Sequence, residues 1–291
     1  MIQRRSVWIA YLLLLPALVC LAVFRLYPIA TTLLGSLYAE SIVQAGKDVF
    51  VGFQNYAQLF RDPVFWQSFW VTIRLNLVIN PLQVLLALLL AIMANQRLRG
   101  ISFYRLLFFI PLGVSLPIAS ILWRTLLDPN SGLVNSLLNL LGISSQPFLI
   151  SKDQALWCIV AVATWKGVSF WMIFLWAGLQ DIPQQLYEAA RIDGAGRLGR
   201  FIRITLPLLR RPLLFVLITD TAVNFLLFVP MFLLTRGGPS YSTNVLMYEA
   251  YKSGFVYGDM GRALALVMVL LLLVVATVAM QFRLFSQEEG S

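Results

Sequence analysis

Six stretches of this chain are each long and apolar enough to cross a lipid bilayer as a helix. A helix rises about 1.5 Å per residue, so about 20 apolar residues span the roughly 30 Å of hydrocarbon. The six stretches cover approximately residues 7–34, 69–94, 106–126, 155–179, 212–234 and 261–282. Backbone polar groups must be satisfied internally in lipid, and helices of this length do so. We predict an all-α integral membrane protein with six transmembrane helices, folded as one transmembrane domain over residues 1–291.

The composition argues against most enzymes. Of the 291 residues, 59% are hydrophobic and 12% are charged, whereas about 25% of a soluble domain is charged. The sequence contains no histidine, which removes the usual general base and the usual metal ligand. Cys20 and Cys158 lie in apolar runs, where a thiol behaves as a small hydrophobe. We expect no catalytic residue, no metal site and no cofactor on this chain.

The distribution of basic residues predicts the orientation. The net charge is +9, which in a soluble protein would suggest nucleic acid, but in a membrane protein it must first be read by the positive-inside rule. With the N-terminus inside, most arginines fall in inner loops, and the outer loops hold only Lys47, Arg61, Lys152, Arg236 and Lys252. We therefore predict that both termini are cytoplasmic, and we expect membrane lipid but no nucleic acid as a partner.

Two shorter features concern the ends of the spans. Arg4 and Arg5 precede an apolar run, as in a cleaved leader, and Cys20 suggests a lipoprotein, but Val19 stands where a small residue is needed. We expect the first span to remain as an anchor.

Residues 133–143 place leucines on one helical face but are too short to span, so we predict an interfacial helix on the outer surface.

The inner loop at residues 180–211 is far longer than the usual connection of about 4–6 residues. Pro183 suits the start of a short helix, and Gly194 would end it in a left-handed turn that a Cβ hinders. A second helix carries apolar residues at helical spacing before Pro207, with arginines interleaved. The pattern predicts a compact helical hairpin between the fourth and fifth spans.

Two interpretations of this hairpin follow from the residues alone. Its arginines suit an amphipathic hairpin that lies on anionic lipid. Alternatively, Glu188 beside the small Ala189 and Ala190 suits a helix that presses its backbone closely into a partner protein. Physical chemistry alone leaves the two interpretations equally supported.

A resemblance favours the second interpretation. The run Glu188-Ala189-Ala190, then Gly194 after three residues, Ile204 after nine more, and Leu206-Pro207, resembles the EAA signature of permease subunits of bacterial ABC importers. Beyond the signature, almost the whole chain is similar to the sugar and glycerol-phosphate branch of that family. Residues 51–56 (VGFQNY) and 234–239 (LTRGGP) resemble two of its outer elements.

The resemblance implies a compact six-span type I importer permease, of the MetI-like fold, in the bacterial cytoplasmic (inner) membrane. Its partners would be a second homologous permease subunit, two cytoplasmic ABC ATPase subunits that bind ATP and Mg, and an extracytoplasmic solute-binding protein. The 180–211 loop would couple ATP hydrolysis on those subunits to transport. The implied coupling residues are Glu188, Ala189, Ala190, Asp193, Gly194, Ile204, Leu206 and Pro207.

Polar residues inside spans are candidates for the solute path, because burying them in lipid is costly. Asn76 and Asn80 share a helix face, as do Asp220 and Asn224. Lys166 and Asp220 lie at comparable depth and could form an ion pair across the bundle. The candidates are Asn76, Asn80, Lys166, Ser169, Asp220 and Asn224.

The function expected is import of a carbohydrate-type solute by alternating access: a sugar, an oligosaccharide, an osmolyte glycoside or a glycerol phosphate. The alternative is a stand-alone secondary transporter or channel, in which the loop is a lipid-bound hairpin. A membrane-embedded enzyme is the least favoured class, because without histidine it would depend on scattered carboxylates. The chain lacks a phosphate-binding G-x-x-x-x-G-K-[ST] loop, so ATP hydrolysis would belong to a partner.

Overall fold

The computed structural model describes residues 2–40, 48–96 and 98–286, and these residues are mainly helical. They divide into two compact units. Unit 1 comprises residues 1–65 and 249–271, and unit 2 comprises residues 66–248 and 272–291. Two long helices, α4 (Pro63–Ala94) and α14 (Met260–Ser286), each contribute residues to both units. The 180–211 loop and all six intramembrane polar candidates belong to unit 2.

Unit 1 begins with a long apolar helical run. It consists of α1 (Ile2–Leu21), the π-helical turn η1 (Ala22–Leu26) and α2 (Tyr27–Gly35). The turn η1 immediately precedes Pro28, whose missing N–H interrupts the regular hydrogen-bond ladder. Between Tyr11 and Gly35 the most apolar window has no buried residue. Such a helix needs lipid or another chain to cover its surface.

The rest of unit 1 is held by polar contacts. Its elements are the antiparallel strands β1 (Tyr38–Glu40) and β2 (Asp48–Phe50), α3 (Gln54–Arg61) and the π-turn η5 (Lys252–Val256), together with the end of α13 (Leu246–Tyr251) and the start of α14. Asn55 Nδ2 donates to the carbonyl oxygens of Ser36 and Tyr38 at 2.8 and 2.9 Å. Arg262 forms ion pairs with Asp62 and Glu249. These contacts join segments far apart in sequence.

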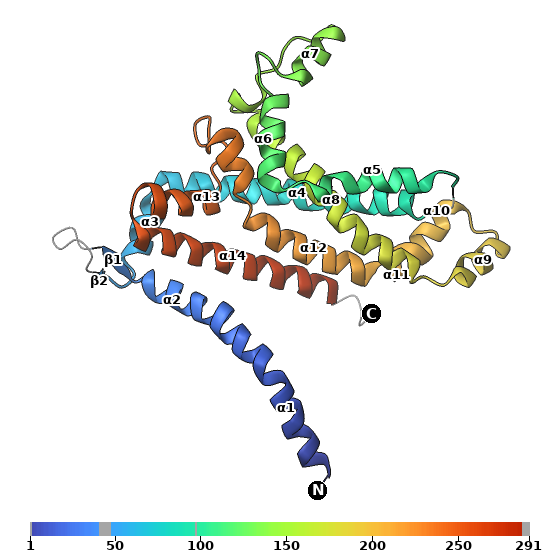
Figure 1. Ribbon diagram of the computed structural model, residues 1–291, viewed down its shortest axis with the longest axis horizontal. Coiled ribbons are helices and arrows are strands. Elements are labelled where there is room, and N and C mark those ends of the chain that lie inside the picture. The colour runs from blue at the N-terminus through green and yellow to red at the C-terminus, as the bar shows by residue number, and fades with distance from the viewer. Residues whose placement is uncertain (1, 41–47, 97, 287–291) are drawn as a thin grey trace. The chain divides into compact units, whose positions relative to one another are not determined.

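Unit 2 is a bundle around α4 and α8, and Figure 1 shows α5 and α12 beside α8. After α4, its elements are α5 (Ile101–Gly113), α6 (Leu116–Leu126), α7 (Leu133–Leu140), η2 (Phe148–Ile150), α8 (Ala155–Gln180), α9 (Gln184–Ile192), α10 (Arg197–Arg200), η3 (Phe201–Thr205), α11 (Leu206–Leu208), α12 (Arg210–Phe225) and η4 (Met231–Thr235). The apolar core is formed by residues of α4, α8 and α12, among them Ala91, Met172 and Val216, which are fully buried.

Four helices of the described residues are long and apolar enough to cross a membrane, and a bent pair, α5 and α6, would make a fifth. The four include the N-terminal run, α4, α8 and α14. The third predicted span is not one straight helix, because the chain bends by 99° between α5 and α6. Pro111, Gly113 and Pro117 surround the break and account for it. The count of six spans is not confirmed and stays a prediction, as does the cytoplasmic position of both termini.

The predicted fifth span, residues 212–234, is also interrupted. Helix α12 ends at Phe225, and helical structure returns only near Pro230 and η4. Pro230 lacks the N–H that would continue the ladder from the carbonyl of Leu226. The second helix predicted in the 180–211 loop does not end before Pro207, contrary to the expectation from the sequence. Pro207 lies inside α11, where the first turn of a helix tolerates it.

Residues 133–143 form helix α7 over Leu133–Leu140, with Leu137 and Leu140 exposed. Its position at the membrane surface stays a prediction.

Candidate functional site

The polar side chains predicted within the spans gather in a buried cluster of unit 2. Asn80 on α4 and Asp220 and Asn224 on α12 are between 1% and 5% exposed. Asn224 Nδ2 lies 2.8 Å from Asn80 Oδ1 and 3.0 Å from Asp220 Oδ1. The spacing of four residues on α12 brings Asp220 and Asn224 to one face, as predicted. Asn80 Nδ2 also donates to Asn76 Oδ1 at 3.4 Å, so four of the six candidates meet in one hydrogen-bonded group.

Other polar side chains complete this cluster, and the candidate set did not include them. Gln83 Oε1 accepts from Asn224 Nδ2 at 3.1 Å, and Gln83 Nε2 donates to the Ala163 carbonyl of α8 at 2.9 Å. Thr221 Oγ1 accepts from Asn80 Nδ2 and from Gln281 Nε2 of α14, at 3.2 and 2.9 Å. Gln83 lies three residues after Asn80, so it shares the polar face of the second predicted span.

Asp220 pairs with a tryptophan and not with Lys166. The Trp171 Nε1–H of α8 donates to Asp220 Oδ1 at 2.6 Å, while Lys166 Nζ donates to the Leu112 carbonyl at 3.1 Å. The expected ion pair between Lys166 and Asp220 is therefore wrong. Lys166 and Trp171 are both on α8, but residues five apart on a helix point in different directions. Trp171 therefore faces Asp220 on α12, while Lys166 faces the end of α5.

Asn76 lies at the edge of the cluster, and Ser169 lies outside it. Asn76 Nδ2 donates to the Thr72 carbonyl of its own helix at 2.9 Å. Ser169 is 2% exposed and lines a separate cavity of about 520 Å³ with Trp165 and Pro111. In this conformation the cluster is a closed contact between helices, because every side chain in it is buried or bonded to its neighbours. One oxygen, Asp220 Oδ2, has no hydrogen-bond partner among the described residues.

The signature of the 180–211 loop lies mainly on an exposed helix. Helix α9 follows Pro183 and has no buried residue. Gly194 has a φ of +79°, and the Ala195 N–H donates to the Ala190 carbonyl at 2.8 Å, which closes the helix end. Few residues other than glycine adopt that φ without strain. The sequence therefore places a short, open helix with a fixed end between α8 and α10.

One hydrogen bond ties this helix to the second half of the loop. Tyr187 Oη and Thr205 Oγ1 are 2.9 Å apart, and Thr205 is buried in η3. Glu188 accepts from Gln184 on the same helix, at 2.8 Å, and stays exposed. Ile192 is 87% exposed.

The other predicted coupling residues lie close to this helix in sequence. Asp193 is the residue at the C-terminal end of α9 and is exposed. Ile204 is half-buried in η3, and Leu206 and Pro207 are exposed in α11. Helix α11 leads within two residues into α12, the helix that carries Asp220.

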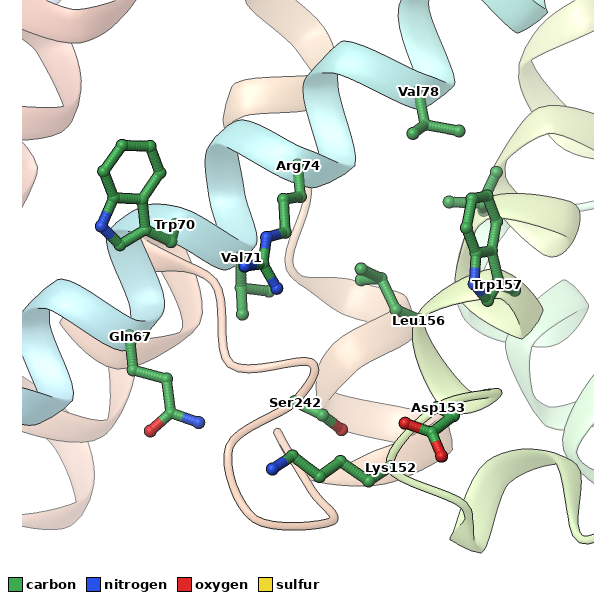
Figure 2. Close-up of a pocket in the computed structure, with 11 residues that line it drawn as sticks. Gln67, Trp70, Val71, Arg74, Val78, Lys152, Asp153, Leu156, Trp157 and Ser242 are labelled. Atoms are coloured by element: carbon green, nitrogen blue, oxygen red, sulfur yellow. The ribbon is translucent and has the colours of Figure 1, made fainter.

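Unit 2 also contains a cavity of about 570 Å³ between α4 and the start of α8. Figure 2 shows Arg74 reaching into it from α4, with Trp70 and Trp157 on either side and Lys152, Asp153 and Ser242 at the far end. We call it the Arg74 cavity. Lys152 and Arg74 are the cations that line it, and Asp153 is the acid.

The family described as "Binding-protein-dependent transport system inner membrane component" matches residues 83–286. That range contains α8, the whole 180–211 loop and α12. The chain belongs to this family. It is thus a permease component of an ABC importer and an inner membrane component of a transport system, which confirms the family predicted from the EAA signature.

Relatives extend the match over nearly the whole chain. The sn-glycerol-3-phosphate transport system permease protein UgpA of Shigella flexneri is 34% identical over 281 residues, which cover 96% of this chain and 94% of that protein. The protein of the same name from Yersinia pestis bv. Antiqua (strain Antiqua) is 35% identical over 277 residues, which cover 95% and 93% of the two chains. The relatives are named as transport permeases and not as enzymes.

Solved structures support the same fold. A chain of the crystal structure of a bacterial alginate ABC transporter in complex with an alginate pentasaccharide-bound periplasmic protein superposes with a TM-score of 0.82. The two chains are 22% identical, and the match covers 95% of this chain and 93% of the other. The comparisons give no support to a stand-alone secondary transporter or channel.

Proposed function

We propose that this permease imports a carbohydrate-type solute by alternating access and that α9 couples transport to a partner ATPase. The solute would be a sugar, an oligosaccharide, an osmolyte glycoside or a glycerol phosphate, as the relatives that act on sn-glycerol 3-phosphate and alginate suggest. The observation that carries the proposal is the exposed helix α9. It presents Glu188, Ala189 and Ala190, ends just before Gly194 and is tied to the second half of the loop at Thr205.

The coupling step follows from the chain path. An ATPase groove that holds α9 would pull the loop when the ATPase subunits close on ATP and Mg. The small Ala189 and Ala190 side chains allow close approach of the helix, and Glu188 supplies a charge for a basic or polar group of the groove. The Tyr187–Thr205 hydrogen bond and the short connection from α11 to α12 would carry this movement into the bundle.

The solute path would open where the buried cluster now closes the bundle. Separation of α4 from α12 would break the Asn80–Asn224 contact and expose polar groups to a solute or water. Asn76, Asn80, Lys166, Ser169, Asp220 and Asn224 remain the proposed lining of this path. Their hydroxyl, amide and charged groups can replace the hydrogen bonds that a hydroxylated solute loses on leaving water.

The assembly would contain this chain, a second homologous permease subunit, two ATPase subunits and an extracytoplasmic binding protein. Six spans with both termini in the cytoplasm would place the 180–211 loop on the ATPase side. The apolar surface between Tyr11 and Gly35, which the other described residues leave uncovered, provides area for lipid or the second permease.

Attachment of the ATPase tests the proposal. The permease would be co-expressed with its ATPase subunits as wild type, Glu188→Lys and Ala189→Arg, with Ser144→Lys in a distant exposed loop as the charge control. We expect both α9 variants to insert normally and retain at least tenfold less ATPase, because they remove the carboxylate or the close approach. Equal ATPase retention by wild type and both α9 variants would overturn the coupling role.

A further inference from the structure

The Arg74 cavity contains a cation that no described residue neutralises with an ion pair. Arg74 makes no ion pair and no side-chain hydrogen bond with any residue in the described ranges, and the same holds for Lys152. Asp153 also lines the cavity, but its carboxylate pairs with neither cation. A guanidinium on a membrane-spanning helix with no acidic partner is a functional candidate by default.

The position of Arg74 along α4 makes it accessible from one side of the membrane. Ala94, the last residue of α4, is 20 residues beyond Arg74, and 20 helical residues cover about 30 Å, the thickness of the hydrocarbon layer. With Ala94 at the inner boundary, the guanidinium lies at the outer boundary. This side assignment rests on the proposed function, in which the 180–211 loop is cytoplasmic.

The lining of the cavity combines charge with flat aromatic surface. Trp70 and Trp157 are 54% and 58% exposed and stand on opposite sides of Arg74 (Figure 2). Indole faces pack against the apolar faces of sugar rings and polyol chains while polar groups take the hydroxyls. Gln67 and Ser242 supply such groups, and Ser242 Oγ has no hydrogen-bond partner among the described residues.

We propose that the Arg74 cavity binds an anionic carbohydrate or polyol at the outer mouth of the permease. Arg74 and Lys152 hold its carboxylate or phosphate group, and Trp70 and Trp157 hold its carbon skeleton. This site is separate from the buried Asn80–Asp220 cluster, so it selects the solute by charge before the solute enters the path. An anionic group can also come from a lipid headgroup of the outer leaflet, and the experiment separates the two sources.

The test uses the complete importer in nanodiscs of zwitterionic phosphatidylcholine and follows binding by saturation-transfer NMR. Two matched pairs of probes are compared: D-glucuronate with D-glucose, and sn-glycerol 3-phosphate with glycerol. We expect each anion to bind at least about tenfold more tightly than its neutral partner, because hydrogen bonds to a charged group are roughly twice as strong as neutral ones. Equal binding within each pair would overturn the proposal.

Variants of opposite sign distinguish the site from a general loss of folding. Arg74→Gln and Lys152→Gln should weaken anion binding by about five- to twentyfold, whereas Asp153→Asn should tighten it because an anion is removed from the lining. Trp157→Leu should weaken binding of both members of a pair, and Trp66→Leu, an exposed tryptophan of α4 outside the cavity, should change neither. Anion binding that is unchanged by Arg74→Gln and Lys152→Gln would overturn the assignment.

A second nanodisc preparation containing phosphatidylglycerol identifies the source of the anion. If the solute occupies the site, glucuronate binding should persist in this lipid. Loss of glucuronate binding together with Arg74-dependent retention of phosphatidylglycerol would assign the cavity to lipid and overturn the solute proposal. ATP-driven uptake is measured on the same samples. Uptake without anion binding refutes this inference alone, and anion binding without ATP-dependent uptake refutes the proposed function alone.

Discussion

The Trp171 indole N–H donates to the Asp220 carboxylate across 2.6 Å and joins α8 to α12 in the buried centre of unit 2. Asp220 is 1% exposed and Trp171 is 3% exposed. A carboxylate buried to this extent depends on its hydrogen-bond donors, because it has exchanged water for them. This contact gives α12 a fixed position relative to α8 in the conformation described.

Removing the indole donor should destabilise the permease. We expect Trp171→Phe and Asp220→Leu each to lower the free energy of unfolding by about 1–3 kcal/mol, because each removes one partner of the bond and leaves the other buried group without it. The double variant should lose less than the sum, since both changes remove the same bond. Denaturation in detergent followed by circular dichroism measures this, with the exposed Trp157→Phe as control. If the double variant lost the full sum of the two single losses in unfolding free energy, that result would contradict a hydrogen bond between Trp171 and Asp220.

Gly167 should be required where α4 crosses α8. A Cβ at this position would lie 2.6 Å from Gln83 Nε2 and 3.0 Å from Gln83 Oε1. We expect Gly167→Ala to destabilise the bundle by about 1–3 kcal/mol through overpacking, and Gln83→Ala to restore part of that loss. Gly113→Ala, which has no atom within 4 Å of its Cβ, serves as the matched control in thermal unfolding. Equal losses of stability in Gly167→Ala and Gly113→Ala would show that a Cβ at residue 167 does not crowd Gln83.

The Tyr187–Thr205 hydrogen bond should affect coupling more than assembly. Tyr187→Phe removes the phenol that contacts Thr205 Oγ1 and leaves the ring in place. Loss of one hydrogen bond is worth about 1 kcal/mol, so α9 should exchange its amide hydrogens about fivefold faster. We expect Tyr187→Phe to raise the number of ATP molecules hydrolysed per solute molecule imported. Thr205→Val should raise this ratio equally. A wild-type ratio in both variants would show that the bond carries no movement.

Backbone conformation at the end of α9 can be tested by a pair of glycines. Gly194 has a φ of +79°, and a Cβ there meets no atom within 4 Å, so Gly194→Ala changes only the backbone preference. Forcing that φ on alanine costs about 1–2 kcal/mol, and we expect ATP-driven uptake to fall severalfold. Gly199→Ala in α10 also meets no atom and should leave uptake unchanged. Uptake that is equally reduced, or equally normal, in the two variants would contradict the role of Gly194.

The sequence predicted those features that depend on local pattern. The apolar length of α8 and α14 indicated both helices, and Pro183 and Gly194 predicted the limits of α9 to within one or two residues. The i and i+4 spacing of Asp220 and Asn224 correctly placed them on one face. These signals lie within a single helix or turn, where covalent geometry fixes the arrangement.

Features that depend on contacts between helices were predicted less well. The partner of Asp220 depends on the rotation of α8, and apolar residues surround Lys166 and Trp171 alike, so periodicity could not choose between them. The 99° bend between α5 and α6 and the break after Phe225 were missed because hydropathy continues through both. The prolines near each break were the available signal. Membrane proteins tolerate prolines within spans, which weakens that signal.

The central claim is that transport through this permease is driven by an ATPase attached at α9. The most direct measurement is uptake into proteoliposomes that contain the complete complex, its binding protein and the solute that this binding protein retains. We predict uptake only with ATP on the side of the ATPase subunits, and a loss of at least tenfold in Ala189→Arg but not in Ser144→Lys. Uptake that proceeds without ATP or without the ATPase subunits would contradict the account.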